Sequence, residues 1–279
     1  MNENQHTGLS VSFRIDDGII EHNNRSFIAK NVVRERIPDN ITYKKQNIRE
    51  FYSELFGEAL AEYNSRMKRR DRIIADYYEH IRKGKQEKTF EEIVVQFGDI
   101  NDCSVGSENG ELAKQMLDQY MRGFETRNPN LKVFNAVMHL DEATPHLHID
   151  FVPITHTGSR GLSTRVSMSG ALREMGFAPE NKFLTEWVAW SDSERSVMEK
   201  ILREHGMYRD DKNVHREHWS VDEYKRKKQA AQEIRSMNDH INALKKKSDD
   251  SYTSEEIAAI KNQNDYMRSE ITKRDEKIA

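Results

Sequence analysis

The stretch from His139 to Asp150 limits the fold of this chain more than any other part of the sequence. Residues 132–138, just before it, are rich in β-forming side chains and follow the turn signal Asn-Pro-Asn. In residues 146–154, apolar side chains alternate with polar ones, which is the period of a strand with one buried face. The intervening Asp-Glu-Ala-Thr-Pro has turn chemistry. The pattern therefore predicts two neighbouring antiparallel strands joined by a tight turn.

The predicted hairpin brings three histidines together. His139 ends the first predicted strand, and His146 and His148 open the second strand on one face. Three converging imidazoles with an open position opposite them are typical of a metal site. A His-x-His pair alone is a weak signal, but a third histidine across a turn that contains Asp141 and Glu142 strengthens it. The sequence therefore favours metal or phosphate chemistry at this hairpin.

Asp150 lies on the same predicted strand face as His146 and His148. Two interpretations are open for it. Its carboxylate orients one of the imidazoles from behind, as carboxylates do in many metal sites. Alternatively, it is an ordinary solvated strand residue.

The composition limits the classes of protein that fit. At 279 residues the chain can hold one large domain, or a domain plus an extension. With 33% charged residues and a mean hydropathy of -0.90, part of the chain is expected to build no core of its own. The net charge of -3 means that any site for a polyanion must be a local patch. The single cysteine and the lack of a signal peptide or membrane-spanning stretch favour a cytoplasmic protein.

Periodicity places the other elements along the chain. Alternation predicts strands at residues 9–15 and 89–99, and apolar stripes at helical spacing predict helices elsewhere. The predicted helices cover residues 19–30, 44–83 with a break near 66–70, 110–126, 167–175 and 181–205, and the predicted loops cover residues 101–109 and 158–166. This order fits an α+β fold, in which helices cover one face of an antiparallel sheet, better than a parallel doubly wound sheet.

The composition changes at about residue 221. Apolar residues then recur at alternating spacings of three and four, which is the seam of a coiled coil, and Asn264 is a polar residue within it. The prediction is a first domain over residues 1–220, which includes the helical segment 181–206, and a helical or coiled-coil extension over residues 221–279. Dimerisation through the extension is favoured over amphipathic packing without a partner. The chain stops within the pattern at Ala279, so we expect a longer parent protein or a truncated gene.

A second motif lies near the N-terminus, where residues 22–25 read His-Asn-Asn-Arg. A lone histidine of this kind is usually a surface or capping residue. Together with the downstream His-x-Asp-Glu-x-x-Pro-His-x-His, however, it resembles the Mob/Pre family of plasmid mobilisation relaxases, also called plasmid recombination enzymes. Residues 161–167, the helix around Trp187 and residues 215–221 are similar to that family as well, so the resemblance covers roughly residues 9–228.

The resemblance implies a histidine-hydrophobe-histidine endonuclease fold, whose central antiparallel strands carry a divalent metal. It implies an enzyme that nicks one DNA strand at a transfer origin and stays covalently attached to the 5′ phosphate. Mn²⁺ or Mg²⁺ is the expected ion, with Zn²⁺ as the alternative. By resemblance, His139, His146 and His148 are the metal ligands, His22 is the nucleophile and Arg25 holds the scissile phosphate. Glu142 matches a carboxylate that orients or deprotonates the nucleophile, and Asp141 is its neighbour.

Tyr43 is the competing nucleophile, because related relaxases of other families use tyrosine. A histidine with a pKa of ~6.5 is mostly neutral at a pH of about 7.5 and is already nucleophilic, whereas a tyrosine with a pKa of ~10 is almost entirely protonated there. We therefore favour His22. If Tyr43 is not a nucleophile, it is an ordinary aromatic residue at the start of a helix.

Single-stranded DNA at a transfer origin is the expected partner, and local basic residues would contact it. One predicted patch comprises Arg34, Arg36, Lys44, Lys45 and Arg49, and a second comprises Arg160 and Arg165 after the hairpin. Arg69 and Arg70 are better explained as part of a solvated face. A basic groove that grips several phosphates gives steep salt dependence.

Two other classes of function fit parts of the sequence. A three-histidine hydrolase would bind zinc and hydrolyse a small substrate without forming a covalent adduct. A non-catalytic scaffold would work through its helices and coiled coil, and replacing His146 and His148 would leave its function intact.

Overall fold

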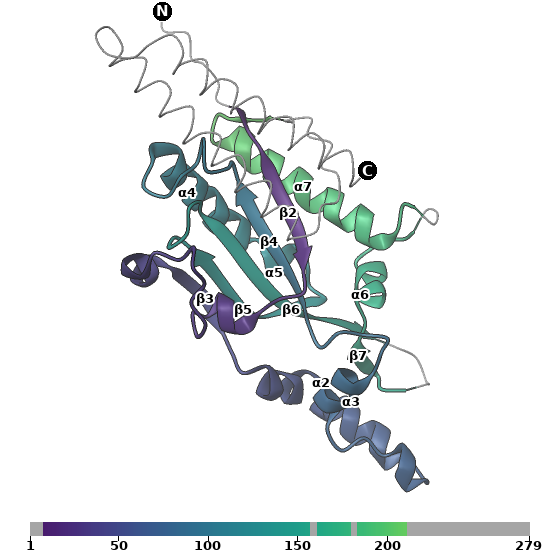
Figure 1. Ribbon diagram of the computed structural model, residues 1–279. Coiled ribbons are helices and arrows are strands. Elements are labelled where there is room, and N and C mark those ends of the chain that lie inside the picture. Colours follow the sequence, from purple (N-terminus) through teal and green to yellow (C-terminus); the bar gives the residue numbers. More distant parts are fainter. Residues whose placement is uncertain (1–7, 157–160, 180–182, 211–279) are drawn as a thin grey trace, which may run out of the picture. The chain divides into compact units, whose positions relative to one another are not determined.

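The fold is built on an antiparallel β-sheet, and the computed structural model describes residues 8–156, 161–179 and 183–210 (Figure 1). The strands follow the order β2-β4-β6-β5-β3, and β7 pairs with the C-terminal part of β6. Their bounds are β2 Val11–Asp16, β3 Ile41–Lys45, β4 Glu91–Phe97, β5 Leu131–His139, β6 His146–His156 and β7 Thr164–Val166. Two short strands, β1 Gly8–Leu9 and β8 Tyr208–Arg209, pair in parallel outside this sheet. The predicted α+β class with an antiparallel sheet is confirmed.

The predicted histidine hairpin forms the centre of the sheet. Strand β6 lies between β4 and β5, and its partner β5 places His139 directly opposite His146 and Val137 opposite His148. Because directly opposed residues share one sheet face, the three histidines project to the same side. The turn between the strands comprises residues 140–145.

The sheet face that carries Leu147, Ile149 and Phe151 forms the main apolar core. It packs against three helices, α4 Glu108–Arg122, α6 Met168–Glu174 and α7 Glu186–Glu204. Each of them begins at a hydroxyl side chain that accepts a hydrogen bond from a backbone N–H of the first turn, at Ser107, Ser167 and Thr185 respectively. The apolar side chains that alternate along the strands are therefore the ones that pack into this core.

A buried polar cluster fastens α7 to the segment around Asn128. The Glu194 carboxylate accepts hydrogen bonds from Tyr120, Arg127 and Asn128, and the Asn128 side-chain oxygen accepts one from the Trp190 indole. None of the side-chain polar atoms of these five residues is buried without a partner. We call these five residues the Glu194 cluster.

The histidine face is covered only in part, at the end of β6 away from the histidines. There, helices α2 Ile48–Ser65 and α3 Tyr77–Lys83 form a second apolar cluster, in which Phe51 and Phe56 gather with Val152 and Ile154. Figure 1 shows both helices beside β7, at one end of the sheet. The prediction that helices cover one face is wrong in this respect, because a second helical layer covers part of the other face.

Most predicted elements are present, with ends shifted by a few residues, but residues 44–83 differ. Residues 41–45 form the edge strand β3 rather than a helix start, and Asn47 caps α2 by accepting hydrogen bonds from the N–H groups of Arg49 and Glu50. The predicted break near residues 66–70 is present, since α2 ends at Ser65 and only a short 3-10 turn, η2 Arg70–Arg72, precedes α3. Residues 164–166, in a predicted loop, form β7.

Several predictions lie outside the described residues. They are the coiled-coil extension over residues 221–279, with Asn264 in its seam, and the position of Arg160. Among the helices of residues 8–156, 161–179 and 183–210, none has the length and apolar composition needed to cross a membrane.

Candidate active site

The three hairpin imidazoles converge on one point of the sheet face. Their ring centroids lie 5.2 Å apart for His139 and His146, 4.6 Å for His139 and His148, and 5.0 Å for His146 and His148. All three side chains are buried. The strand register alone produces this convergence, because the pleat points all three side chains the same way.

Each of these imidazoles has one nitrogen engaged by an oxygen. His139 Nε2 lies 2.9 Å from the Asn23 carbonyl, His146 Nδ1 lies 2.8 Å from the Thr144 carbonyl, and His148 Nδ1 hydrogen-bonds to the Glu92 carboxylate. A carbonyl oxygen only accepts, so His139 carries its proton on Nε2 and His146 on Nδ1. The opposite nitrogens then offer lone pairs.

Two of the opposite nitrogens, His139 Nδ1 and His148 Nε2, are buried without any hydrogen-bond partner. An unpaired buried nitrogen of this kind costs free energy in the folded state unless a ligand occupies its lone pair. Neutral imidazoles that present lone pairs are the preferred ligands of several divalent metals. The donor set therefore fits a bound divalent cation.

Two overlapping groups of side chains have potential ligand atoms within 4.8 Å of one another. One comprises His22, His139 and His148, and the other comprises His139, Glu142 and His146. The two groups share His139, and together they contain all three predicted ligands with Glu142 and His22 as further candidate ligands. A mixed set of imidazoles and one carboxylate suits Mn²⁺ and Zn²⁺ alike.

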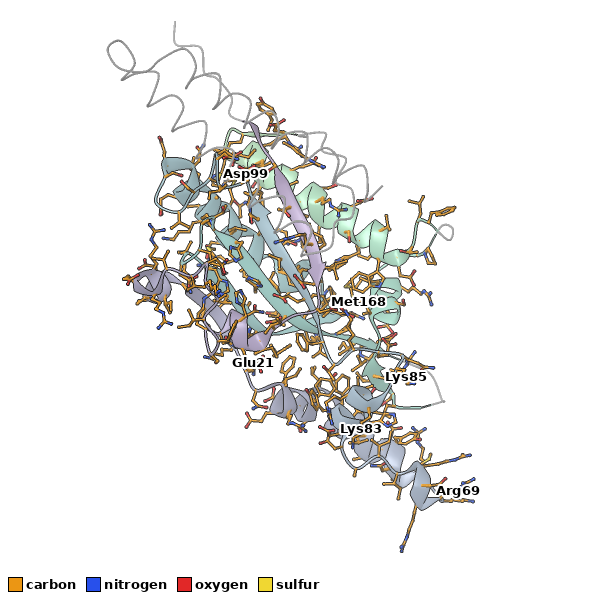
Figure 2. All side chains as sticks on the ribbon, in the orientation of Figure 1. Glu21, Arg69, Lys83, Lys85, Asp99 and Met168 are labelled. Atoms are coloured by element: carbon orange, nitrogen blue, oxygen red, sulfur yellow. The ribbon has the colours of Figure 1, made fainter. Side chains whose placement is uncertain are left out.

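His22 lies on a single helical turn, α1 Ile20–Asn23, which brings it close to the hairpin. The preceding residue of this turn, Glu21, is labelled in Figure 2. Its ring centroid lies 5.6 Å from that of His139 and 5.8 Å from that of His148. Its Nε2 lies 3.5 Å from an oxygen of Glu142. The structure therefore brings together the two motifs on which the resemblance was based.

The helix predicted for residues 19–30 is wrong beyond this turn. Arg25 has a φ of 55°, in the left-handed region, and this ends the helix. Positions 22 and 25 are nevertheless close together, since Arg25 Nη1 lies 3.3 Å from His22 Nε2. The tertiary contacts of Asn23 and Arg25, described below, select this conformation over a longer helix.

Arg25 is bound to the hairpin turn. Its Nε and Nη2 donate to the Asp141 carboxylate at 2.7 and 2.5 Å, and Nη2 also donates to Glu142 at 2.9 Å. Its side chain is only 6% exposed. Asn40 donates to Asp141 and Asn31 donates to Glu142, at 2.7 and 2.6 Å. The guanidinium for which we expected a phosphate is thus paired with two carboxylates here.

Burial dominates the electrostatics of the histidines. Burial, and then the neighbouring His146, lower the pKa of His139 to about 3, and burial also lowers the pKa of His146 and of His148. Burial, and then the charge of Arg25, lower the pKa of His22. All four imidazoles are therefore neutral at pH 7, which is the form that binds a metal or attacks phosphorus.

A buried layer of carboxylates and amides lies behind the histidines. Asp150 accepts hydrogen bonds from Asn23 and Asn135, at 3.1 and 2.7 Å, and hydrogen-bonds to none of the described imidazoles. Its side chain has no exposed surface, so it is not a solvated residue. The carboxylate that hydrogen-bonds to a hairpin imidazole is that of Glu92, on β4, which the sequence did not single out. Two adjacent glutamates within an apolar strand were the only signal for it.

Burial and the neighbouring Asp150 raise the pKa of Glu92 to about 8, and burial raises that of Asp150 to about 6. A cation bound at the imidazoles opposes both shifts, since it stabilises the ionised carboxylates. We call His139, His146, His148, Glu92, Asn135 and Asp150 together the histidine cluster.

Tyr43 lies away from these groups. It is on β3, its ring packs against the core of the opposite sheet face, and its hydroxyl donates to Asp118 of α4 at 3.0 Å. Burial, and then the hydrogen bond to Asp118, raise its pKa above the ordinary tyrosine value. Both its position and its protonation disfavour it as a nucleophile at the histidines.

The predicted DNA-contacting residues are dispersed. Arg34 and Arg36 are exposed on the 3-10 turn η1 Arg34–Asp39, which is tied to the hairpin turn by a 2.7 Å bond from Val33 N to the Asp141 carbonyl. On β3, Lys45 is exposed and Lys44 is paired with Glu125 at 3.5 Å. Arg165 is half-buried on β7, and Arg49 is paired with Asp76 and Glu79. Of the predicted contacts within the described part of the chain, only the η1 pair is tied directly to the hairpin turn.

Comparison with known proteins places this geometry in a family. A family model described as plasmid recombination enzyme, Mob_Pre, matches residues 17–175. Among solved structures, the MobM relaxase domain (MOBV; Mob_Pre) bound to plasmid pMV158 oriT DNA is similar over 78% of this chain and 98% of that chain, at 17% identity and a TM-score of 0.46, in an Mn-bound crystal structure. A second such structure, with 23 nucleotides, has 18% identity and a TM-score of 0.45 over 78% of this chain and 97% of that chain.

No curated protein matches the chain. The family model, in contrast, matches more than half of the 279 residues, and its match includes both the His22 turn and the histidine hairpin. This chain therefore belongs to the family of plasmid recombination enzymes.

Proposed function

We propose that the chain is a relaxase, which nicks one strand of single-stranded DNA at a transfer origin and stays attached to the 5′ phosphate, for mobilisation or recombination of a plasmid. The observation that carries the proposal is the approach of His22 to two buried imidazoles, those of His139 and His148, each of which has an unpaired nitrogen. Such a site combines a neutral nucleophile with a place for a divalent cation. Family membership and the fold support the same function.

His22 is the proposed nucleophile. One of its ring nitrogens forms a bond to phosphorus while the bond between phosphorus and the 3′ oxygen breaks, and the 3′ oxygen leaves with the upstream strand. Its lowered pKa keeps the imidazole neutral at pH 7, so no strong base is needed before attack. Glu142, 3.5 Å from Nε2, orients the ring or accepts its proton. The N–P product is energetic enough to allow the strand to be rejoined.

His139, His146 and His148 are the proposed metal ligands, and Glu142 has a ligand atom within 4.8 Å of those of His139 and His146. When bound, Mn²⁺ or Mg²⁺ neutralises charge on the non-bridging phosphate oxygens and aligns the scissile bond. Zn²⁺ is the alternative ion.

We propose that Arg25 contacts the scissile phosphate and that it also has a structural role. Its bonds to Asp141 and Glu142 hold the His22 turn against the hairpin turn, so it also fixes the distance between nucleophile and ligands. Arg34, Arg36, Lys44, Lys45, Arg160 and Arg165 are the proposed phosphate contacts of the strand on either side. We propose residues 1–220 as the relaxase domain and residues 221–279 as a helical extension that can pair two copies.

The test uses the full chain with end-labelled single-stranded origin DNA and Mn²⁺, followed by a denaturing gel and mass spectrometry of the attached residue. The expected result is an adduct on His22 that is absent when EDTA is added. Cleavage or hydrolysis without an adduct would support the three-histidine hydrolase instead. An adduct on Tyr43 would overturn the assignment of the nucleophile.

A further inference from the structure

Asn23, the residue next to His22, is buried and contacts both ends of the polar layer behind the histidines. Only 1% of it is exposed, although it lies in a short surface turn. Its backbone carbonyl lies 2.9 Å from His139 Nε2. Its side-chain amide donates to Glu92 at 3.0 Å and to Asp150 at 3.1 Å. One residue therefore engages the hairpin with both its backbone and its side chain.

The contact with Glu92 extends to a second imidazole. The same oxygen of Glu92, Oε1, accepts from the Asn23 amide and bonds to His148 Nδ1. Asn23 thus acts on His139 directly and on His148 through Glu92. In both imidazoles the engaged nitrogen is the one opposite to the unpaired nitrogen. These contacts fix the tautomer and the ring plane of the two side chains that present free lone pairs.

We infer that Asn23 is a positioning residue that couples the nucleophile turn to the metal ligands, with Glu92 as its intermediate. The inference rests on the proposed function, because it assumes that the imidazoles bind a cation. A shift of the His22 turn moves the Asn23 carbonyl and amide, and with them the two imidazoles. The nucleophile and the ligand set are therefore assembled as one unit, not as two independent parts.

A merely structural role is the competing explanation, and it makes a different prediction. If Asn23 and Glu92 only satisfy buried groups, their replacement lowers the stability of the fold and leaves the metal affinity of the folded protein unchanged. If they position the imidazoles, metal affinity falls even where the fold is intact. Substitution of outer groups that orient metal-binding histidines weakens metal binding by about 10- to 100-fold.

The experiment measures Mn²⁺ affinity of the full chain without DNA, by electron paramagnetic resonance of the free ion, with circular dichroism melting as a check of folding. The variants are Glu92→Gln, which keeps the shape of the side chain but cannot ionise, Asn23→Ala, and the double variant. The matched controls are Glu91→Gln, on the same strand and paired with Lys88, and Asn24→Ala, in the same turn as Asn23.

We expect the dissociation constant for Mn²⁺ to rise by about 10- to 100-fold in each single variant and to stay unchanged in both controls. We expect the double variant to lose less than the product of the two single effects, because the two side chains act through one path to His148. Unchanged Mn²⁺ affinity in folded Glu92→Gln protein, or fully multiplicative effects, would overturn the inference. Failure of the wild-type chain to bind Mn²⁺ would instead overturn the proposed function.

Discussion

The Glu194 cluster and the histidine cluster are both buried and polar, and they lie on opposite faces of the same sheet. In the Glu194 cluster every buried side-chain polar atom has a partner within the chain. In the histidine cluster, three buried side-chain atoms have none among the described residues, at Asn135, His139 and His148. A saturated cluster holds elements together, whereas an unsaturated one keeps bonding capacity for a ligand. Burial of polar groups alone would not have distinguished them.

The difference predicts that chemistry resides entirely on the histidine side. Replacing His22 by Ala should abolish the covalent adduct, with a loss of at least about 1000-fold in the rate of adduct formation. Tyr43→Phe should form adduct at the wild-type rate, since Tyr43 faces the other core. Single-turnover assays on denaturing gels measure both. Adduct formation by His22→Ala would remove the distinction between the faces.

The second prediction concerns the metal. His148→Ala should weaken Mn²⁺ binding by more than about 100-fold, because it removes a ligand and not merely an orienting group. Glu194→Gln, the control from the saturated cluster, should bind Mn²⁺ as tightly as wild type. Titration calorimetry without DNA measures both affinities. Equal weakening in the two variants would mean that each acts through general destabilisation.

The third prediction concerns stability, for which the Glu194 cluster should matter and the metal should not. Glu194→Ala should lower the free energy of unfolding by about 3 kcal/mol, because it leaves a buried tyrosine, an asparagine and Arg127 without their common acceptor. Its folded form should retain Mn²⁺ affinity. Urea unfolding of the metal-free protein gives the stability difference. A free energy of unfolding close to that of the wild type would show that the Glu194 cluster does not stabilise the packing of α7.

The smallest expected effect tests the exposed arginines beside the histidine face. Arg34→Gln with Arg36→Gln should weaken binding of single-stranded DNA and reduce the slope of log affinity against log salt by about 1.4, since two phosphate contacts are lost. Arg195→Gln with Arg203→Gln, on α7, removes the same charge elsewhere and should leave the slope unchanged. Fluorescence anisotropy across a salt series measures it. An equal change in both pairs would indicate a general charge effect.

The hairpin could be predicted because its information is local. The alternation of residues 146–154 fixes which side chains share a face, and the turn chemistry fixes the pairing, so the convergence of the histidines follows from the sequence. The apolar alternation of β4 and the helical stripes of α4 and α7 carry similar local information. These elements are therefore found close to their predicted ranges.

The parts that could not be predicted depend on distant partners. The helical turn at His22 ends early because Asn23 and Arg25 form hydrogen bonds to Asp150 and Asp141, which lie more than 100 positions away along the chain. Strand β3 has five residues, and its pairing with β5 is not visible in so short a segment. Glu92 has no significance until β6 places His148 beside it. In each case a tertiary contact decided what local propensity left open.

The left-handed backbone of Arg25 has a consequence for which residues position 25 tolerates. Its φ of 55° is most readily adopted by glycine, asparagine or aspartate, whereas its contacts with Asp141 and Glu142 require a long guanidinium. No standard side chain meets both demands without strain. Lysine keeps the charge but loses the bidentate geometry, and glycine relaxes the backbone but leaves two carboxylates unpaired. A substitution series at this position therefore separates the cost of backbone conformation from the value of the ionic contact.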